Sequence, residues 1–469
     1  MEQTRIERDS IGEKAIPADA YYGIQSLRAL ENFSITGTRM HSEMIRSLAI
    51  LKKACAIANA QAGVLDWKRA DAISWACDQI AKGHYQDQFI VDPMQGGAGT
   101  SMNMNANEVI ANLAITRLGG TRGDYTLVHP NDHVNCGQST NDVIPTAGKM
   151  TTLVLMRKLE KALQTLQNAL EKKAVAFDPI VKMGRTQLQD AVPVRLGQEF
   201  HAYATSVARG LARVRHAGHE LLTINMGGTA IGTGLNADDG YFRSVTEILS
   251  AHMDAPFRQA EDLIDATQNV DCFAAVSGAV RNCAIALSKI ANDLRLMSSG
   301  PRTGFGEINL PARQNGSSIM PGKVNPVIPE VVNQVAFRVA GNDVTISMAV
   351  EAGQMELNAF EPVIFCCLFQ SIDELARAVQ TFTVNCVEGI TANEERCEEL
   401  LESSVGIVTA LCPYIGYAKA AVLAKDALRQ KISIRQLVLD RGLMTAEQLE
   451  SILNVDHMTR PGISGKTSV

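Results

Sequence analysis

Helical periodicity dominates the middle of the chain. Apolar residues at positions 270, 273, 276, 280, 283, 287, 290 and 294 are spaced three or four apart, which places them on one face of an α-helix. The apolar residues between Leu153 and Leu170 repeat the pattern. Proline is absent from 146–178, 194–255, 257–300 and 363–412. The pattern therefore predicts several long amphipathic helices.

Helices of this length need partners that cover their apolar faces. A helix of about 30 residues is roughly 45 Å long, and several such helices bury their stripes against one another as a bundle. They are also longer than most helices of globular proteins. We therefore predict a helical bundle whose apolar surface is shared between identical subunits.

The two ends of the chain show a different pattern. Residues 1–141 contain many Gly, Pro and Asn residues, and the predicted helices become short after about residue 390. The sequence thus predicts three parts. These are a mixed, mainly helical N-terminal domain (1–141), a central long-helix bundle (142–396) and a small helical C-terminal domain (397–469).

Helix starts in the C-terminal part are marked by capping boxes, in which Ser or Thr is followed three residues later by Glu or Gln. The pattern begins at Thr391, Ser433 and Thr445. Gly442 is placed to end the helix that begins after Ser433.

Composition and charge narrow the function classes. Hydrophobic residues make up 46% of the 469 residues and charged residues 20%, as in soluble globular proteins. A net charge of −6 and 5% aromatic residues argue against a nucleic-acid partner. We find no signal peptide and no uncharged apolar run of 18 residues, so we predict no membrane segment. Ten scattered cysteines without C-x-x-C favour reduced thiols and a cytoplasmic protein.

The segment GSSIMPGKVNP at 316–326 mixes hydroxyls, one lysine and four Gly or Pro residues. It fails the phosphate-binding P-loop pattern because Pro321 replaces the second Gly and Val324 follows Lys323. The glycine-rich segments 95–101 and 227–236 likewise miss the dinucleotide spacing. A nucleotide cofactor is not predicted, and 316–326 is either a connector or a loop that handles a small anion.

Metal ligands are not predicted either. His216 and His219 could share one helix face, but such pairs arise by chance and a solvated face is the better interpretation. The sequence contains no H-E-x-x-H and no Cys/His cluster.

Hydroxyl and amide side chains gather in four short segments: 100–103, 138–142, 184–187 and 316–326. Each alone is typical of a turn or a helix N-cap. Together they supply neutral hydrogen-bond donors and a single lysine, which suits the binding of a small carboxylate.

These segments closely resemble the aspartase/fumarase superfamily, whose members eliminate a group beta to a carboxylate and release fumarate. GSSIMPGKVNP carries the superfamily pattern G-S-S-x-x-P-x-K-x-N. The likeness continues through QGGAGTSMNMNANEV, HVNCGQSTND, GRTQLQDAVP, GGTAIGTGLN and NDLRLMSSGP, over essentially the whole chain. The resemblance implies an all-α homotetramer with a central twenty-helix bundle between smaller N- and C-terminal domains. Each active site would be built by three subunits.

Within the superfamily, QGGAGTS, EDLIDATQNVD and GRTQLQD are more similar to aspartases than to fumarases. The resemblance therefore implies reversible anti-elimination of ammonia from L-aspartate, giving fumarate through an enediolate. Two alternatives stay open. One is a class II fumarate hydratase, with water as leaving group, and the other is a non-catalytic structural relative, as some lens crystallins are.

The resemblance also implies roles for individual residues. Ser317 would be the catalytic base, and its alkoxide would need backbone N–H groups and Lys323 to stabilise it. The residues expected around the β-carboxylate and its enediolate are Thr100, Ser139, Thr140 and Ser318. Those expected at the α-carboxylate are Lys323 and Asn325, and those expected around the amino group are Asn141, Thr186 and Gln187.

One site position departs from the superfamily pattern. Many members carry His where Gln187 stands, paired with the equivalent of Glu330, so an acid at this position is not expected here. His129 and His133 match a fumarase segment near a secondary anion site, but loop packing is the better interpretation. Magnesium activates some aspartases, yet no ligand set for it is found in this sequence, and no cofactor is predicted.

Overall fold

The structure is a computed structural model that describes residues 3–466, and the chain forms two compact units. The first comprises the residues up to Glu160 with Ala212–Ile285 and Val335–Ala376, and the second comprises Lys161–Leu211, Ala286–Gln334 and the residues from Arg377 on. This division does not follow the three predicted domains, whose boundaries stay a prediction.

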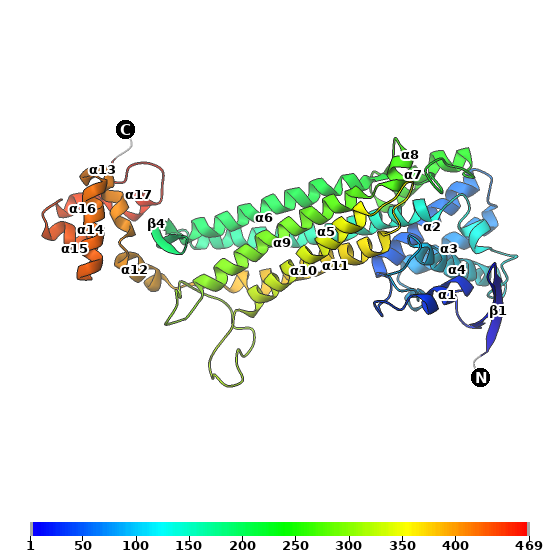
Figure 1. The fold of residues 1–469 in the computed structure, drawn as a ribbon, viewed down its shortest axis with the longest axis horizontal. Coiled ribbons are helices and arrows are strands. Elements are labelled where there is room, and N and C mark those ends of the chain that lie inside the picture. Colours follow the sequence, from blue (N-terminus) through cyan, green and yellow to red (C-terminus); the bar gives the residue numbers. More distant parts are fainter. Residues whose placement is uncertain (1–2, 467–469) are drawn as a thin grey trace. The chain divides into compact units, whose positions relative to one another are not determined.

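Short helices and two small sheets build most of the first unit (blue, cyan and green in Figure 1). The strands are β1 (Thr4–Asp9), β2 (Gly12–Pro17), β5 (Thr223–Ile224) and β6 (Arg258–Gln259). The helices are α1 (Ile24–Asn32), α2 (Ser42–Gln61), α3 (Trp67–Ala81), α4 (Thr100–Arg117), α7 (Asp239–Met253) and α8 (Leu263–Gln268), with a π-helical turn η2 at Pro130–Val134. Helix α2 packs against α3 and α7, and α3 packs against α4.

Five long helices form the predicted bundle (Figure 1). They are α5 (Thr140–Ala176), α6 (Leu196–Gly218), α9 (Asp271–Met297), α10 (Val327–Glu351) and α11 (Glu361–Asn385). Side chains join neighbouring helices. In the first unit, Asp343 of α10 accepts hydrogen bonds from Ser277 and Arg281 of α9, and in the second Tyr203 of α6 donates to Asp293 of α9. The all-α, long-helix fold is confirmed.

The apolar stripes occupy the positions that their spacing predicted. All eight stripe residues from Val270 to Leu294 are buried, and so is the second set except for Leu153, which is half-buried. By length and composition, α9 is the one helix in the described part of the chain that could cross a membrane. Bundle helices with a buried stripe share that composition, so it is weak evidence for a membrane span.

The second unit carries the C-terminal helices and further short strands. The strands are β3 (Val181–Thr186), β4 (Gln189–Arg195), β7 (Ile308–Asn309) and β8 (Thr391–Ala392). The helices are α12 (Glu394–Ser403), α13 (Cys412–Ile415), α14 (Tyr417–Gln430), α15 (Ile434–Asp440), α16 (Ala446–Ile452) and α17 (Val455–Met458). A separate apolar core lies among them, with Leu411, Leu423, Val438 and Leu449 at its centre.

Two of the three predicted helix caps are present. Thr445 forms a complete capping box, and Ser433 accepts the expected backbone hydrogen bond. Gly442 has a left-handed φ of 57° just beyond the end of α15, as predicted. The cap at Thr391 is wrong: this residue pairs in β8, and α12 begins after Asn393. Strand pairing with β7 holds the Thr391 backbone extended, so it cannot enter a helix.

Candidate active site

The first predicted segment forms the start of α4. Gly97, Ala98 and Gly99 all have left-handed φ angles, of 88°, 54° and 85°, and the Thr100 hydroxyl donates to the Gly97 carbonyl at 2.7 Å. A Cβ at Gly99 would lie 2.8 Å from the Ile144 side chain. Glycine therefore lets the N-terminus of α4 pack closely against the first turns of α5.

The second segment caps α5. The Ser139 hydroxyl accepts from the Asn141 N–H at 3.2 Å, and Asp142 Oδ1 accepts from the Ser139 N–H at 2.9 Å. The capping interpretation of this segment is correct. In addition, Asn103 Nδ2 of α4 donates to Thr140 Oγ1 at 3.3 Å, which links the two helix starts.

Two helix N-termini thus bring together four predicted site residues: Thr100, Ser139, Thr140 and Asn141. Helix N-termini carry partial positive charge and unpaired N–H groups, and they attract carboxylates. These residues can therefore bind an anion through neutral hydrogen-bond donors, without a lysine side chain among them.

The loop 227–234 is tied to the start of α5 by a buried carboxylate that the sequence analysis missed. Asp142 Oδ2 accepts from the N–H groups of Gly227 and Thr229 at 3.3 and 3.1 Å. Asn141 Nδ2 donates to the Ala230 carbonyl at 2.6 Å, which leaves Asn141 Oδ1 as the acceptor of that amide. Desolvation by burial raises the pKa of Asp142 to about 7. The glycine-rich segment 227–236 is the signal in the sequence that points to such a loop.

The third segment is the tip of the β3–β4 hairpin. Thr186 pairs with Gln189, and the two turn residues between them, Gln187 and Leu188, have left-handed φ angles of 54° and 61°. Such two-residue turns normally contain glycine or asparagine. Residues other than Gly, Asn or Asp rarely adopt this conformation, which strains the backbone, and both residues are exposed.

A buried charge cluster supports this hairpin. Arg185 forms an ion pair with Glu307 at 2.7 Å and lies over the Phe305 ring, 4.1 Å from its centroid. Lys182 pairs with the other oxygen of Glu307 at 2.9 Å and with Glu199 at 3.1 Å. These contacts fix the strand that presents Thr186 and Gln187.

The fourth segment, 316–326, is a loop closed at its base. The Gly316 N–H donates to the Lys323 carbonyl at 3.0 Å, and Asn325 Nδ2 donates to the Gly316 carbonyl at 2.8 Å. The Ser317 hydroxyl oxygen accepts from two backbone N–H groups, those of Ile319 at 3.2 Å and Met320 at 3.0 Å. The loop therefore directs two amide dipoles at this one oxygen.

Ser318 and Lys323 are exposed in the same loop. Neither side chain has a hydrogen-bond partner among residues 3–466. A Cβ at Gly316 would lie 2.4 Å from the Lys323 carbonyl oxygen, and Gly322 has a left-handed φ of 83°. These glycines let the loop fold back on itself and leave the ammonium group available for an anion.

Some predicted residues are not in mutual contact. In the described part of the second unit, no hydrogen bond or ion pair joins Gln187 to Glu330 or to the loop 316–326. The predicted site residues thus belong to separate groups: one at the helix starts of the first unit, and a hairpin tip and a loop in the second.

The histidines singled out in the sequence have structural partners. His129 Nδ1 accepts from the N–H groups of Asn131 and Asp132, and His133 Nδ1 accepts from the His129 N–H. His129 also lines a cavity of about 540 Å³ that Arg8 and Arg28 line as well. His216 is exposed on α6, in agreement with a solvated helix face, whereas His219 is exposed just beyond the end of that helix. Among residues 3–466, no three His, Cys, Asp or Glu side chains gather as a metal site would require.

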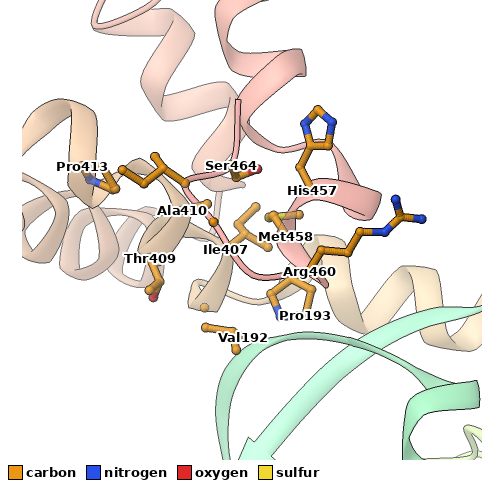
Figure 2. Close-up of a pocket in the computed structure, with 13 residues that line it drawn as sticks. Val192, Pro193, Ile407, Thr409, Ala410, Pro413, His457, Met458, Arg460 and Ser464 are labelled. Carbon is orange, nitrogen blue, oxygen red and sulfur yellow. The ribbon is translucent and has the colours of Figure 1, made fainter. Parts of the chain in front are cut away.

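A further cavity, of about 220 Å³, lies between β4 and the C-terminal helices (Figure 2). Val192 and Pro193 line it from β4, and Ile407, His457 and Arg460 from the C-terminal region. It contains none of the predicted site residues, and the side chains of His457 and Arg460 are exposed.

Comparison with known proteins places the chain in a family. The family described as Lyase matches residues 12–341, and the one described as Fumarase C C-terminus matches 407–460. An aspartate ammonia-lyase from Bacillus sp is 55% identical over 462 residues, which covers 98% of this chain and 99% of the relative. Those of Bacillus subtilis and Escherichia coli are 52% and 46% identical, again over 97% or more of both chains.

Solved structures agree with this assignment. A Brucella melitensis protein described as fumarate lyase:delta crystallin bound to cobalt superimposes with a TM-score of 0.95 at 48% identity, covering 98% of this chain and all of the other. A class II fumarase from Schistosoma mansoni superimposes with a TM-score of 0.94 at 34% identity, covering 97% and 99%. The chain belongs to the aspartase/fumarase superfamily of lyases.

Proposed function

We propose that the protein is an aspartate ammonia-lyase, which eliminates ammonia from L-aspartate and releases fumarate in a reversible reaction. Relatives of that name are 46–55% identical over nearly the whole chain, whereas the fumarase from Schistosoma mansoni is 34% identical. The hydroxyl- and amide-rich segments supply what a four-carbon dicarboxylate needs.

The observation that carries the mechanism is the environment of Ser317. Removing the C3 proton of aspartate requires a base, and a free serine hydroxyl is a poor one at neutral pH. Its oxygen receives two backbone N–H groups, and Lys323 lies in the same loop. Donors of this kind stabilise an alkoxide and lower the pKa of the hydroxyl, so Ser317 can accept the proton.

The negative charge then moves onto the β-carboxylate, which becomes an enediolate. Stabilising this charge is the main electrostatic task of the enzyme, and fixed donors in a preformed site suit it best. The Ser139 and Thr140 hydroxyls at the start of α5 accept from the Asn141 N–H and from Asn103 Nδ2, so each keeps its own hydrogen to donate to the substrate. The Thr100 hydroxyl donates to the Gly97 carbonyl in this structure and would have to turn to reach the substrate. Ser318 would add a further hydroxyl donor.

The leaving group is recognised by acceptors. With its Nδ2 bound to the Ala230 carbonyl, Asn141 offers Oδ1 to a substrate ammonium. Thr186 and Gln187 present a hydroxyl and an amide on the strained hairpin tip. The amino group is already protonated in the substrate and leaves as neutral ammonia with the electrons of the C–N bond, so Gln187 in place of an acidic histidine is compatible with the reaction. Lys323 and Asn325 would bind the α-carboxylate.

Fumarate production separates this proposal from its alternatives. The purified protein is incubated with L-aspartate, L-malate or buffer, and fumarate is followed by its ultraviolet absorbance. We expect fumarate from L-aspartate. Fumarate from L-malate alone would identify a fumarate hydratase, and no fumarate from either substrate would favour a structural relative.

We further propose a homotetramer in which three subunits complete each site. The face of α10 formed by Phe337, Val344 and Met348 is apolar and 60–68% exposed in the single chain, with spacings of seven and four that keep the three on one side of the helix. An exposed apolar face of this kind marks a protein interface. A second copy of this chain is the proposed partner, and a small dicarboxylate is the proposed substrate.

Phe337→Glu is expected to break this assembly, because a carboxylate would be buried without a partner at the interface. Size-exclusion chromatography with light scattering should then report species smaller than a tetramer, with activity reduced at least tenfold. Val422→Glu, at an exposed apolar position of α14, is the matched control and should remain tetrameric. A tetrameric, fully active Phe337→Glu variant would contradict the proposed interface.

The cytoplasm is the proposed location. All ten cysteines are without a disulfide partner, and a reducing compartment keeps them so. Six of the ten are buried, where burial raises the pKa of thiols such as Cys55 to about 12 and makes them unreactive.

A further inference from the structure

A fully buried lysine lies beneath the helix starts that hold the candidate carboxylate site. Lys52 of α2 has no exposed surface, and its Nζ donates to Asn135 Oδ1 at 2.8 Å and to Gln138 Oε1 at 2.9 Å. Both partners are neutral amides, and Lys52 forms no ion pair within the described residues. An ammonium buried without a carboxylate partner is costly, so its retention calls for a reason.

Hydrogen bonds connect this lysine to the site. Asn135 Oδ1, which accepts from Lys52, also accepts from Asn103 Nδ2 at 3.2 Å, and Asn103 Nδ2 in turn donates to Thr140 Oγ1 at 3.3 Å. Gln138, the other partner, immediately precedes Ser139 in the chain. The lysine therefore anchors both the side chain that contacts Thr140 and the turn that leads into Ser139.

Further buried amide side chains belong to the polar cluster around Lys52. Asn103 and Asn107 are buried, and both donate to Asn135 Oδ1 at 3.2 Å. Their Oδ1 atoms have no hydrogen-bond partner within residues 3–466. In such a low-dielectric setting a charge acts strongly on its surroundings.

The titratable groups around Lys52 place little negative charge near its ammonium group. They are Asp142 at the start of α5, Cys55 on α2 itself and Cys77 on α3. Burial raises the pKa of Cys55 to about 12, and it raises that of Cys77 still further, so both thiols are neutral. Asp142, with its pKa raised to about 7, is the one group of the three that can be negative near neutral pH.

We propose that Lys52 is a positioning residue for the elimination. It holds the Asn135–Asn103–Thr140 chain in place and supplies a buried positive charge beneath the β-carboxylate as that group becomes an enediolate. The inference rests on the proposed function, because it assumes a dianionic intermediate at Thr140.

Lys52→Met tests the charge, because methionine is similar in shape and neutral. Lys149→Met is the matched control: Lys149 is also buried, on α5, and donates to the Thr223 carbonyl at 2.7 Å, outside the cluster. We expect kcat for L-aspartate to fall about 10- to 100-fold in Lys52→Met, the effect of one or two lost charge-dependent contacts. The KM should rise less than kcat falls, since the enediolate carries more charge than the bound substrate. Lys149→Met should change kcat less than threefold.

The pH profile distinguishes a charge from a structural support. Burial lowers the pKa of Lys52 to about 8, so kcat/KM of the unaltered enzyme should decline as pH rises through about 8 and the lysine loses its proton. This decline should be absent in Lys52→Met and present in Lys149→Met. The melting temperature of Lys52→Met should change little, because removal of the buried charge offsets the loss of its two hydrogen bonds.

Three results would contradict either the role of Lys52 or the proposed function. Unchanged kcat in Lys52→Met would overturn the inference. So would a loss of activity in which the decline near pH 8 persists and the melting temperature falls, since that describes a structural residue. If the unaltered protein forms no fumarate from L-aspartate, the proposed function itself fails. Calorimetric binding of succinate, an unreactive dicarboxylate, then tests Lys52 alone: weaker binding is expected in Lys52→Met, and equal binding would overturn the inference.

Discussion

Ser317→Ala should reduce kcat for L-aspartate by about 10²- to 10⁴-fold, the range that a general base contributes. The alanine variant keeps the loop but has no oxygen to take the C3 proton. The two N–H groups released, those of Ile319 and Met320, lie in an exposed loop, where water can replace the hydroxyl as their acceptor. Steady-state kinetics measure kcat, and calorimetry with succinate measures binding, which should stay within about threefold of the original.

Ser318→Ala is the comparison for this experiment. Its hydroxyl belongs to the same loop but receives no backbone N–H group among residues 3–466, and its proposed role is that of one donor among several. A loss of about tenfold is expected. If Ser317→Ala retained more than about a tenth of kcat, an effect below ~1.4 kcal/mol, Ser317 would not be the base.

Asp142→Ala is expected to have the second largest effect, because it damages both the stability and the site. The carboxylate accepts the N–H groups of Ser139, Gly227 and Thr229, and the last two bonds are buried. Each buried donor left without an acceptor costs about 1–3 kcal/mol. A loss of at least ~2 kcal/mol in the free energy of unfolding is therefore expected, together with a loss of kcat/KM as the loop that holds Asn141 moves.

Asp142→Asn is the control for Asp142→Ala, since its amide keeps one acceptor oxygen and should lose less in both measurements. Thermal melting and steady-state kinetics provide the two readouts. If Asp142→Ala had the melting temperature and the kinetic constants of the unaltered protein, the loop 227–234 would not depend on this carboxylate.

Because Asp142 titrates, the difference in stability between the unaltered protein and Asp142→Asn should depend on pH. Burial raises the pKa of Asp142 from 3.8 to about 7, so the folded protein binds this proton more tightly than the unfolded chain does. The resulting stability is complete below pH 3.8, declines as the pH rises toward 7, and is absent above it. The melting-temperature difference between the unaltered protein and Asp142→Asn should therefore become smaller as the pH is raised from 4 to 7. A constant difference over this range would contradict the raised pKa.

Spacing along the sequence was sufficient to predict the structural features whose physical cause lies within a few neighbouring residues. The stripe from Val270 to Leu294 predicted a buried helix face because side chains three and four residues apart share one side of a helix. The caps at Ser433 and Thr445 were predictable because each bond joins residues three apart. At Thr391 the same reasoning failed, because strand pairing with Asn309, 82 residues away, overrides the local preference.

In the candidate site, too, some features could be predicted from the sequence and others depend on the tertiary structure. Ser317 and Lys323 could be chosen from the sequence because the loop 316–326 is a contiguous segment with a specific pattern. The strain at Gln187 and Leu188 was not predictable, since neither residue favours a left-handed φ. The tertiary fold keeps these two residues in that conformation through the hairpin register and the charge cluster of Lys182, Arg185 and Glu307.

By itself, the sequence determined the long-helix fold, the family resemblance and the polar segments that carry the chemistry, because these depend on periodicity and on contiguous residues. The tertiary structure decided which segments meet. It set the start of α4 against that of α5, tied the loop 227–234 to Asp142, and buried Lys52 beneath Thr140. These contacts join residues tens of positions apart, and close packing of helices, which no local pattern encodes, brings them together.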